Sequence, residues 1–383
     1  MSYLASRARA VRWRLRSGLR SSLRSGLRSG LRPRARVAAL LMAAAFAGTS
    51  VACGLAAPGY RGNDSRYFDG HAFANQVPTP TKDLSDVLRW KMTSEAGPWE
   101  VRTATTPARP PPARVGRGEL RVTWINHATV LIQMDGLNIL TDPIWSERAS
   151  PFSFVGPKRM HPPGVPFAQL PAIDVVLVSH NHYDHLDIST LARLARDHRP
   201  IILAGLGTRA LLKQEGIGRG HDMDWWETRR IGRAVSVTAV PAQHWSRRGF
   251  GDTNNTLWAG FVIVGTQGPV YFAGDTGWGP HFEQIRARFG PIRLALLPIG
   301  AYKPRWFMRS MHISPAEAVD AARILEAQFT VPIHWGTFAL GDDGQDEPIQ
   351  ALEDNLNVVN DPPTFLRLDF GEGRTLGGTG PGG

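Results

Sequence analysis

The run SHNHYDHLD, directly after the apolar run VVLV, carries the densest group of metal-ligand side chains in this sequence. His180, His182, Asp184 and His185 fall within six positions. Imidazoles at alternate positions can converge on one cation, and the adjacent Asp–His pair can bind a second one. A polar loop with solvated histidines is the competing interpretation. The density of ligand-type side chains favours half of a two-metal hydrolytic site.

Three further ligand-type residues also follow strand-like runs. His244 follows VSVTAV, Asp275 follows PVYFAG, and His334 closes TVPIH. Taken alone, each is more often a structural residue than a ligand. Together with the first loop they supply five histidines and two aspartates, which are too many ligands for one tetrahedral centre.

The elements that must position these residues are visible as apolar runs. Runs of strand type follow one another from residue 120: LRVTWIN, TVLIQM, LNILT, VVLVS, PIILA, VSVTAV, WAGFVIV, PVYFAG, LALLPI and TVPIH. Apolar residues recur at helical spacing over residues 188–196, 208–215, 280–289 and 315–328. Ser314, Pro315 and Glu317 form a capping box at the start of the last helix. This interleaving predicts an α/β layered domain with a mixed sheet.

The same pattern gives the expected domain organisation. Residues 119–370 are predicted to form one domain, and residues 371–383 a flexible tail. Residues 53–118 are predicted to be an extended leader and linker packed on the core, with one short helix over 84–92. The proline run at 110–112 marks the entry to the compact part.

The net charge of this chain is concentrated at its start. The formal charge is +11, and residues 1–36 contain eleven arginines and no acidic residue. The remaining 33 basic residues of 44 face 33 acidic ones, so the rest of the chain is neutral. This balance argues against a nucleic-acid partner. A hydrophobic content of 42% in 383 residues instead predicts a globular protein with a large core.

Residues 1–52 are predicted to be an arginine-rich leader followed by a signal-like segment. The apolar run over residues 37–52 is shorter than the roughly 20 residues that span a membrane, and a basic stretch before such a run is typical of a secretory signal. Cys53, the only cysteine, follows directly and is a candidate lipidation site. Ordinary cleavage nearby, an incidental cysteine and a downstream start codon are the alternatives. We expect an exported protein of the cell envelope, either lipid-anchored or periplasmic or extracellular.

Over nearly all of residues 120–340, these motifs resemble the metallo-β-lactamase superfamily. The resemblance implies a four-layer αββα sandwich with the site at the loop ends of its two sheets. It implies seven metal ligands, in two groups of three with one bridging aspartate: His180, His182 and His244; Asp184, His185 and His334; and Asp275. It also implies that Asp142, in LTDP, supports the ligand loop, for which a turn aspartate before proline is the alternative.

Within the superfamily, the chain is similar to the N-acylphosphatidylethanolamine-hydrolysing phospholipase D family. The strings that carry this similarity are TWINHATVLIQMDGLNILTDPIW, VSHNHYDHLD, PAQHWSRRG, FAGDTG, IGAYKPRWFM and MHISPAEAV. By their place in these motifs, His127 and His312 are candidate substrate-binding or supporting histidines, or else structural ones. His312, Asp184 and Asp275 are the candidate catalytic residues.

The AYKPRWFM segment combines cations with aromatic residues. Lys303 and Arg305 are expected to bind a phosphate, and Tyr302, Trp306 and Phe307 to form an apolar wall beside it. A solvated charge pair next to core aromatics is the alternative. This mixture suits an amphiphile with a charged head, so a phospholipid or another phosphodiester is the expected substrate and a membrane surface the expected partner.

The expected chemistry is phosphodiester hydrolysis by a hydroxide that bridges two divalent cations, with Zn²⁺ expected and Mn or Fe also compatible with His and Asp ligands. A lactonase or other ester hydrolase with the same dinuclear site is the enzyme alternative. A nucleic-acid or anionic-surface binding protein on this fold is the alternative from another class. The sequence leaves the oligomeric state open, with a homodimer as one possibility.

Overall fold

The computed structural model describes residues 56–79, 82–103 and 109–377. The predicted arginine-rich leader, the signal-like segment and Cys53 therefore lie outside the described residues. All described residues belong to one unit, Ala56–Gly383.

Seven strands form the first sheet, in the order β13-β1-β2-β3-β4-β5-β6. They are β1 (Leu120–Asn126), β2 (Thr129–Met134), β3 (Leu137–Thr141), β4 (Val175–Val178), β5 (Ile201–Gly205), β6 (Gly220–Met223) and β13 (Gly373–Leu376). Strands β3 to β6 are mutually parallel, whereas β13, β1, β2 and β3 pair antiparallel. The sheet is thus mixed, as the sequence predicts.

The second sheet has six strands, in the order β12-β11-β10-β9-β8-β7. They are β7 (Thr228–Ile231), β8 (Val235–Val240), β9 (Gly260–Gly265), β10 (Gly268–Phe272), β11 (Leu294–Pro298) and β12 (Phe329–Ile333). Because β9 is antiparallel to both β8 and β10, strands β8, β10, β11 and β12 all run in one direction.

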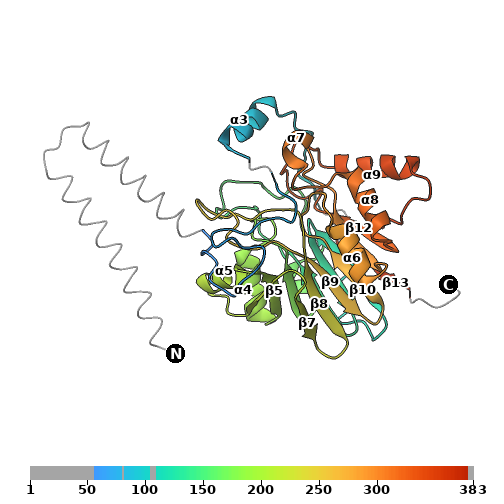
Figure 1. Cartoon of the computed structure of the whole chain (residues 1–383). Helices are drawn as coiled ribbons and strands as arrows, with labels where there is room; N and C mark the ends of the chain where they lie inside the picture. Colours follow the sequence, from blue (N-terminus) through green and yellow to red (C-terminus); the bar gives the residue numbers. More distant parts are fainter. Residues whose placement is uncertain (1–55, 80–81, 104–108, 378–383) are drawn as a thin grey trace, which may run out of the picture. The chain divides into compact units, whose positions relative to one another are not determined.

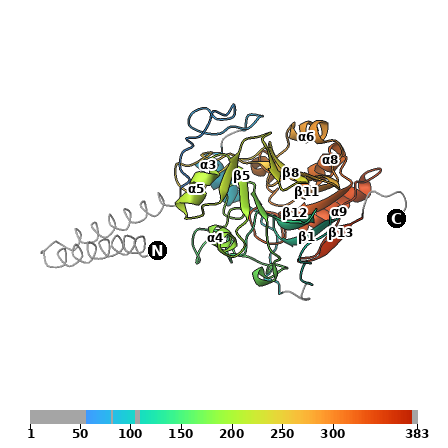
Figure 2. The same cartoon turned by 90° about the horizontal axis from the view of Figure 1, so that it is seen from below.

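Helices cover the outer face of each sheet. Helices α4 (Ile188–Asp197) and α5 (Thr208–Gln214) lie on the first sheet, and α6 (His281–Phe289), α8 (Pro315–Ile324) and α9 (Glu347–Val358) lie on the side of the second (Figures 1 and 2). Side chains alternate along β4: Val175 and Leu177 enter the core between the sheets, whereas Val176 and Val178 pack under the helices. The predicted four-layer αββα sandwich is confirmed.

The predicted helices are all present at their predicted positions, but one of them ends earlier than predicted. The capping box of Ser314 and Glu317 is present, but α8 stops at Ile324 rather than at residue 328. Glu326 has a φ of +45°, so the α-helix cannot continue through this residue. Helix α9, the short α7 (Arg305–Met308) and the 3₁₀ turn η1 (Phe167–Gln169) have no counterpart in the prediction.

Three strands have no counterpart in the prediction, and all three are sheet edges. β6, β7 and β13 terminate their sheets, and each buries few side chains. Because an edge strand gains little from apolar burial, its sequence carries little periodic signal. The predicted tail is corrected here: residues 373–376 form β13, with Leu376 opposite Leu120 of β1.

The leader segment contributes to the body of the molecule. Tyr67 and Phe73 are buried in the core between the sheets, and the backbone N–H of Ala57 donates to Asp252 at 2.8 Å. Helix α3 (Leu84–Thr93) follows the N-cap Asp83 and ends one residue later than the predicted 84–92. No helix within the described ranges is both long enough and apolar enough to cross a membrane.

Candidate metal centre

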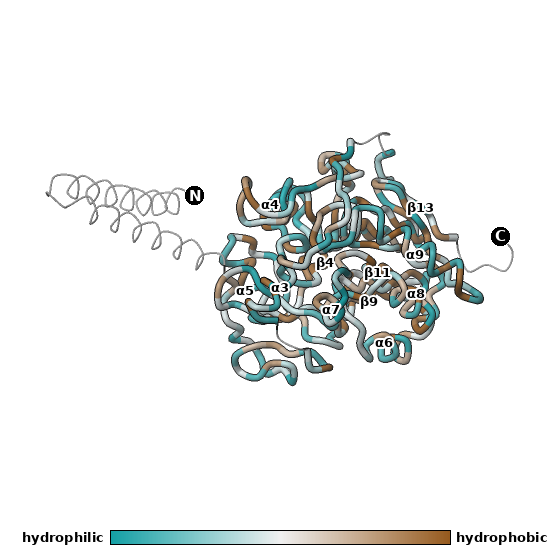
Figure 3. The backbone as a smooth tube through the Cα atoms, turned by 90° about the horizontal axis from the view of Figure 1, so that it is seen from above, coloured by the Kyte–Doolittle hydropathy of each residue, from teal (hydrophilic) through white to brown (hydrophobic). Residues whose placement is uncertain are grey.

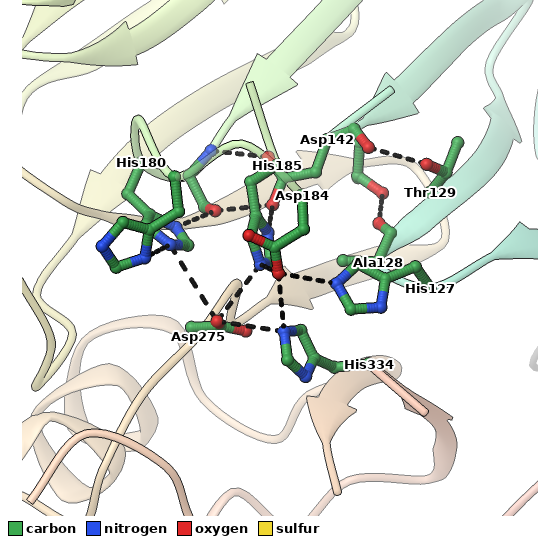
Figure 4. A network of polar contacts seen from close by, with 12 residues as sticks. His127, Ala128, Thr129, Asp142, His180, Asp184, His185, Asp275 and His334 are labelled. Atoms are coloured by element: carbon green, nitrogen blue, oxygen red, sulfur yellow. Dashed lines mark hydrogen bonds and ion pairs between the residues drawn. The ribbon is translucent and has the colours of Figure 1, made fainter. Parts of the chain in front are cut away.

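The parallel strands deliver the ligand-type residues to one edge of the sandwich. Strands β1, β3 and β4 of the first sheet run in one direction, as do β8, β10 and β12 of the second. The residues that follow these six strands meet at their ends: His127, Asp142, His180, His182, Asp184, His185, His244, Asp275 and His334. Figure 4 shows His127, Asp142, His180, Asp184, His185, Asp275 and His334 around this point. The cluster therefore joins the loop ends of both sheets.

Gly274 permits the close approach of β10 to β4. Its φ is +61°, and a Cβ at this position would lie 2.4 Å from the Cβ of Ser179. Any larger residue would push Asp275 away from the loop after β4.

Asp275 lies between two groups of ligand-type atoms. Its Oδ2 is 3.1 Å from the Nε2 atoms of both His185 and His334 (Figure 4). The same oxygen is 3.9 Å from His180 Nε2 and 3.8 Å from His244 Nε2. This is the position expected for a carboxylate that bridges two cations.

Each group of three is itself compact. In the first group, His182 Nδ1 lies 2.8 Å from His180 Nε2 and 3.3 Å from His244 Nε2. In the second, Asp184 Oδ2 lies 3.1 Å from His185 Nε2 and 3.3 Å from His334 Nε2. The structure thus brings all seven predicted ligands together. His127 also belongs to the group of Asp184, His185 and His334, and His312 lies in a group with His244 and Asp275.

The chemistry of this donor set fits divalent cations. Asp275 Oδ1 is buried and has no hydrogen-bond partner among the described residues. Buried polar atoms without partners cost about 1–3 kcal/mol each. Imidazole nitrogens and carboxylate oxygens that converge without competing donors would be satisfied together by bound metal ions.

Burial and the carboxylates of the cluster shift the pKa values of its histidines in opposite directions. Burial lowers the pKa of His182 to about 3 and that of His244 to about 4, so both imidazoles are neutral at pH 7, as ligands must be. Burial opposes charge on His334, but the carboxylates beside it raise its pKa to about 9. Burial also opposes charge on Asp275, but the neighbouring imidazoles hold its pKa well below the usual range. The carboxylates therefore demand positive charge at this centre, which divalent ions would supply.

Asp142 fixes the loop that carries the first ligands. Its carboxylate accepts from His185 Nδ1 at 2.6 Å, from the Ser179 hydroxyl at 2.5 Å and from the Ser179 backbone N–H at 2.7 Å (Figure 4). The Nε2 atom of His185 is thereby directed toward Asp184 and Asp275. Such a partner orients a ligating imidazole and selects its tautomer.

Replacing Asp142 by Asn should weaken metal binding by roughly 10- to 100-fold, because the amide orients His185 less well and lowers its basicity. Metal affinity measured by competition with a chelator tests this expectation. Asp174→Asn is the matched control, since this carboxylate lies before β4, at the opposite end of the strand, and pairs with Arg114. Unchanged metal affinity of the Asp142→Asn protein would show that Asp142 does not support the metal ligands.

Three residues of the centre have left-handed backbone conformations. φ is +44° at His127, +32° at Asp142 and +64° at His334. Non-glycine residues adopt this region at a cost and keep it where the surroundings enforce it. One such restraint is the hydrogen bond from the His334 N–H to the His127 carbonyl at 3.0 Å.

Both remaining candidate histidines lie at the cluster. His127 Nε2 is 2.9 Å from Asp184 Oδ2, and the residue is 1% exposed. His312 Nδ1 is 3.9 Å from Asp275 Oδ2, and its side chain is 12% exposed. His312 is thus slightly exposed, as is Asp184, whose side chain is also 12% exposed.

The AYKPRWFM segment is used differently from the expectation. Lys303 forms an ion pair with Glu347. Arg305 pairs with Glu317 at 2.8 Å and donates to the His312 carbonyl at 2.9 Å. The cations expected to bind phosphate are thus engaged by carboxylates, and Arg305 holds the loop that carries His312.

The aromatic residues of this segment divide between core and surface. Tyr302 and Phe307 are buried, at 7% and 8% exposure, whereas Trp306 is 38% exposed. The expected apolar wall therefore reduces to Trp306 as a solvent-facing side chain.

Asn75 is a site residue that the sequence did not reveal. Its side-chain amide donates to the His244 carbonyl at 2.7 Å and accepts from the His244 N–H at 3.1 Å. The indole N–H of Trp258 donates to the same Asn75 oxygen at 2.9 Å. A single asparagine in a polar leader carries no pattern, so only the structure identifies it.

Replacing Asn75 by Ala should lower metal affinity by roughly tenfold, because the backbone of His244 loses both hydrogen bonds that position it. Asn63→Ala is the control, since the Asn63 side chain is exposed in the same leader. Metal titration and thermal unfolding on both proteins separate the loss of a ligand position from a loss of folding. Equal affinities in the two variants would leave Asn75 a purely structural role.

Comparison with known proteins agrees with this geometry. A family model described as a beta-lactamase superfamily domain matches residues 137–335. The chain is 39% identical over 266 residues to N-acyl-phosphatidylethanolamine-hydrolyzing phospholipase D 1 of Caenorhabditis elegans, which covers 66% of this chain and 75% of the relative. It is also 39% identical over 323 residues to an uncharacterized protein of Mycobacterium tuberculosis, with 80% and 84% covered.

A third relative and two solved structures extend the comparison. The mitochondrial N-acyl-phosphatidylethanolamine-hydrolyzing phospholipase D of Saccharomyces cerevisiae is 36% identical over 237 residues, with 60% of this chain and 50% of the relative covered. Igni18, a metallo hydrolase of Ignicoccus hospitalis, has a TM-score of 0.52 at 20% identity, with 68% and 99% covered. An isothiocyanate hydrolase from Delia radicum gut bacteria has a TM-score of 0.53 at 20% identity, with 66% and 98% covered, and these two likenesses concern the fold alone.

The four-layer sandwich, the histidine and aspartate cluster at its loop edge and the matching family model lead to one assignment. This chain belongs to the β-lactamase superfamily and is a metal-dependent hydrolase of that superfamily.

Proposed function

We propose that this chain is a phosphodiesterase of phospholipase D type that hydrolyses N-acyl-phosphatidylethanolamine-like lipids. The observation that carries the proposal is the position of Asp275 between two groups of three ligand-type residues, since two adjacent cations suit the displacement of an oxygen at phosphorus. The 39% identity to a phospholipase D relative supports the choice of substrate class. Hydrolysis of the P–O bond would release an N-acylethanolamine and a phosphatidate.

The residues of the cluster have separate proposed roles. We assign His180, His182 and His244 to one divalent ion, and Asp184, His185 and His334 to the other, with Asp275 shared. Bound ions, for which we propose Zn²⁺, would supply Lewis acidity and a nucleophile from water at neutral pH. The remaining roles belong to the side chains around them.

His312 is the proposed contact to the reacting phosphate. Its Nδ1 is buried without a hydrogen-bond partner among the described residues, and burial lowers its pKa well below the usual value, so the imidazole is neutral at pH 7. A neutral imidazole has one N–H, which can donate to a phosphoryl oxygen or to the departing alkoxide oxygen. Arg305 would position this ring through the His312 carbonyl.

Replacing Arg305 by Met should lower kcat/KM by about tenfold on every substrate, equivalent to about 1.4 kcal/mol. The loss should not depend on substrate charge, because Arg305 acts through His312 and Glu317 rather than on the phosphate. Steady-state kinetics on an anionic phosphodiester and a neutral lactone test this. A loss confined to the phosphodiester would restore the direct phosphate contact expected from the sequence.

An ester or lactone hydrolase is the second candidate function. The pairing of Lys303 and Arg305 with carboxylates favours it, because this segment then offers no free cation to an anionic head. The same ligands would serve either reaction.

One experiment separates the two candidates. Turnover is measured side by side on N-acyl-phosphatidylethanolamine, phosphatidylethanolamine, a bis-aryl phosphodiester and lactones, with the metal content determined on the same sample. Preference for the N-acylated phospholipid supports the proposal, whereas preference for a lactone replaces it by the second candidate.

We also propose export to the cell envelope, with acylation of Cys53 as the anchor. A bacterial lipoprotein carries several acyl chains, which suffice for stable attachment where one chain is marginal. Mass spectrometry of the mature N-terminus tests this. An intact arginine leader on cytosolic protein would overturn both export and acylation.

A further inference from the structure

Helix α3 carries an apolar stripe that no described residue covers. Leu84, Leu88 and Met92 are 73%, 55% and 85% exposed. Residues four positions apart lie on one face of a helix, so the three side chains form a continuous stripe. Single exposed apolar residues are common on proteins, but an aligned set marks a surface that is covered by a partner.

The opposite face of α3 is fixed to the body of the molecule. The Trp90 indole N–H donates to Asp342 at 2.9 Å, and the Trp90 ring lies 4.8 Å from that of Phe307 in α7. The Ser94 hydroxyl donates to the same aspartate at 2.7 Å. Figures 1 and 3 show α3 beside α7. Because the helix is anchored on this side, the stripe faces outward.

Cations and a tryptophan border the stripe. Arg89 directly follows Leu88 on the helix, and Lys91 directly precedes Met92. The Arg89 guanidinium lies 4.5 Å from the ring centroid of the partly exposed Trp306. The acidic residues Asp83 and Asp86 are engaged in the capping box at the N-terminus of α3. An apolar stripe with flanking cations and an interfacial tryptophan is the composition of a helix that lies in a lipid headgroup region.

This surface belongs to the same edge as the metal centre. α7, on which α3 rests, leads directly to His312, whose N–H donates to the Met308 carbonyl at 2.9 Å. Trp278, three residues after Asp275, is 38% exposed, and Phe250, in the loop after β8, is 77% exposed. Exposed apolar side chains thus gather on the loops that follow the ligand-bearing strands.

We propose that the stripe of Leu84, Leu88 and Met92, together with Trp306, docks this chain on a phospholipid bilayer. The choice of a bilayer rests on the proposed function and on the flanking cations, which match lipid phosphates. Docking here brings the loop edge that carries the metal centre to the membrane surface.

The test compares the full chain with its Leu84→Gln/Leu88→Gln/Met92→Gln variant in sedimentation with phosphatidylcholine vesicles. Glutamine has nearly the helix propensity of leucine and methionine, so α3 should persist, and thermal unfolding checks this. About 0.5 M salt shortens the screening length to a few ångströms and suppresses binding through the arginine-rich leader. The readout is the partition coefficient, so it is independent of which substrate the centre hydrolyses.

The triple variant should partition at least about tenfold less than the unaltered chain, since three apolar side chains no longer enter the bilayer. Val358→Gln is the matched control, because Val358 is 79% exposed at the end of α9, and it should partition normally. Lys91→Glu is a second, independent variant. At lower salt, where charge is less screened, it should bind more weakly than the unaltered chain to vesicles that contain anionic lipid.

An unchanged partition coefficient in the folded triple variant would overturn the proposal. If that variant also changes from dimer to monomer in solution, the stripe belongs to a contact with a second copy of this chain. Normal docking without hydrolysis of N-acyl-phosphatidylethanolamine would refute the proposed function alone.

Discussion

Replacing Asp275 by Ala should lower kcat/KM by at least about 10³-fold, equivalent to about 4 kcal/mol of transition-state stabilisation. Its Oδ2 lies within 3.9 Å of imidazoles from both groups of three. Removing this carboxylate takes a ligand and a negative charge from both ion positions at once. Metal content should fall together with activity, and elemental analysis with steady-state kinetics measures both.

The control for this experiment is Asp320→Ala, because Asp320 is exposed on α8 and is not one of the ligand-type residues of the cluster. Asp275→Asn adds a finer test, since it keeps the size of the side chain but loses the charge. Near-normal turnover of the alanine variant would show that another residue bridges the two groups.

The predictability of this centre follows from the direction of its strands. Buried strands have apolar runs that the sequence displays, and parallel strands must release their next residues at a common edge. His244, Asp275 and His334 each follow such a run, so the sequence alone predicts their convergence with the HNHYDH loop. Their grouping into two sets of three came from the resemblance to a family rather than from spacing.

Contacts between distant segments explain what the sequence did not reveal. Asn75 meets His244 across 169 positions, and no local pattern marks either partner. Arg305 and Lys303 look like phosphate ligands in the sequence because their partners Glu317 and Glu347 are not adjacent to them in the chain. A cation that already pairs with a carboxylate binds an anionic substrate less readily, and tertiary structure decides this pairing.

The edge strands illustrate the same limit for the fold. β13 reads as GRTL within a glycine-rich stretch, yet its backbone pairs with β1 over four residues. Its stability comes from backbone hydrogen bonds to a strand that lies more than two hundred residues earlier, and these leave no periodic signature in side-chain hydropathy.

Removing metal from the purified protein should abolish hydrolysis and also reduce its stability. We expect close to two ions per chain before chelation, because seven ligand-type residues form two groups of three with one shared carboxylate. In the metal-free protein, Asp275 Oδ1 stays buried without a partner among the described residues. Ions that bind only the folded state stabilise it by mass action, so the melting temperature should fall on chelation.

Reconstitution with Zn²⁺, Mn²⁺ or Fe²⁺ should restore activity in proportion to the second equivalent of metal rather than the first. If the two groups act together on one phosphate, protein with a single ion lacks half of the charge stabilisation that the reaction needs. Titration of the metal-free protein with turnover, metal content and melting temperature followed on the same samples decides this. Full activity at one ion per chain would leave the superfamily assignment intact and remove the two-ion mechanism.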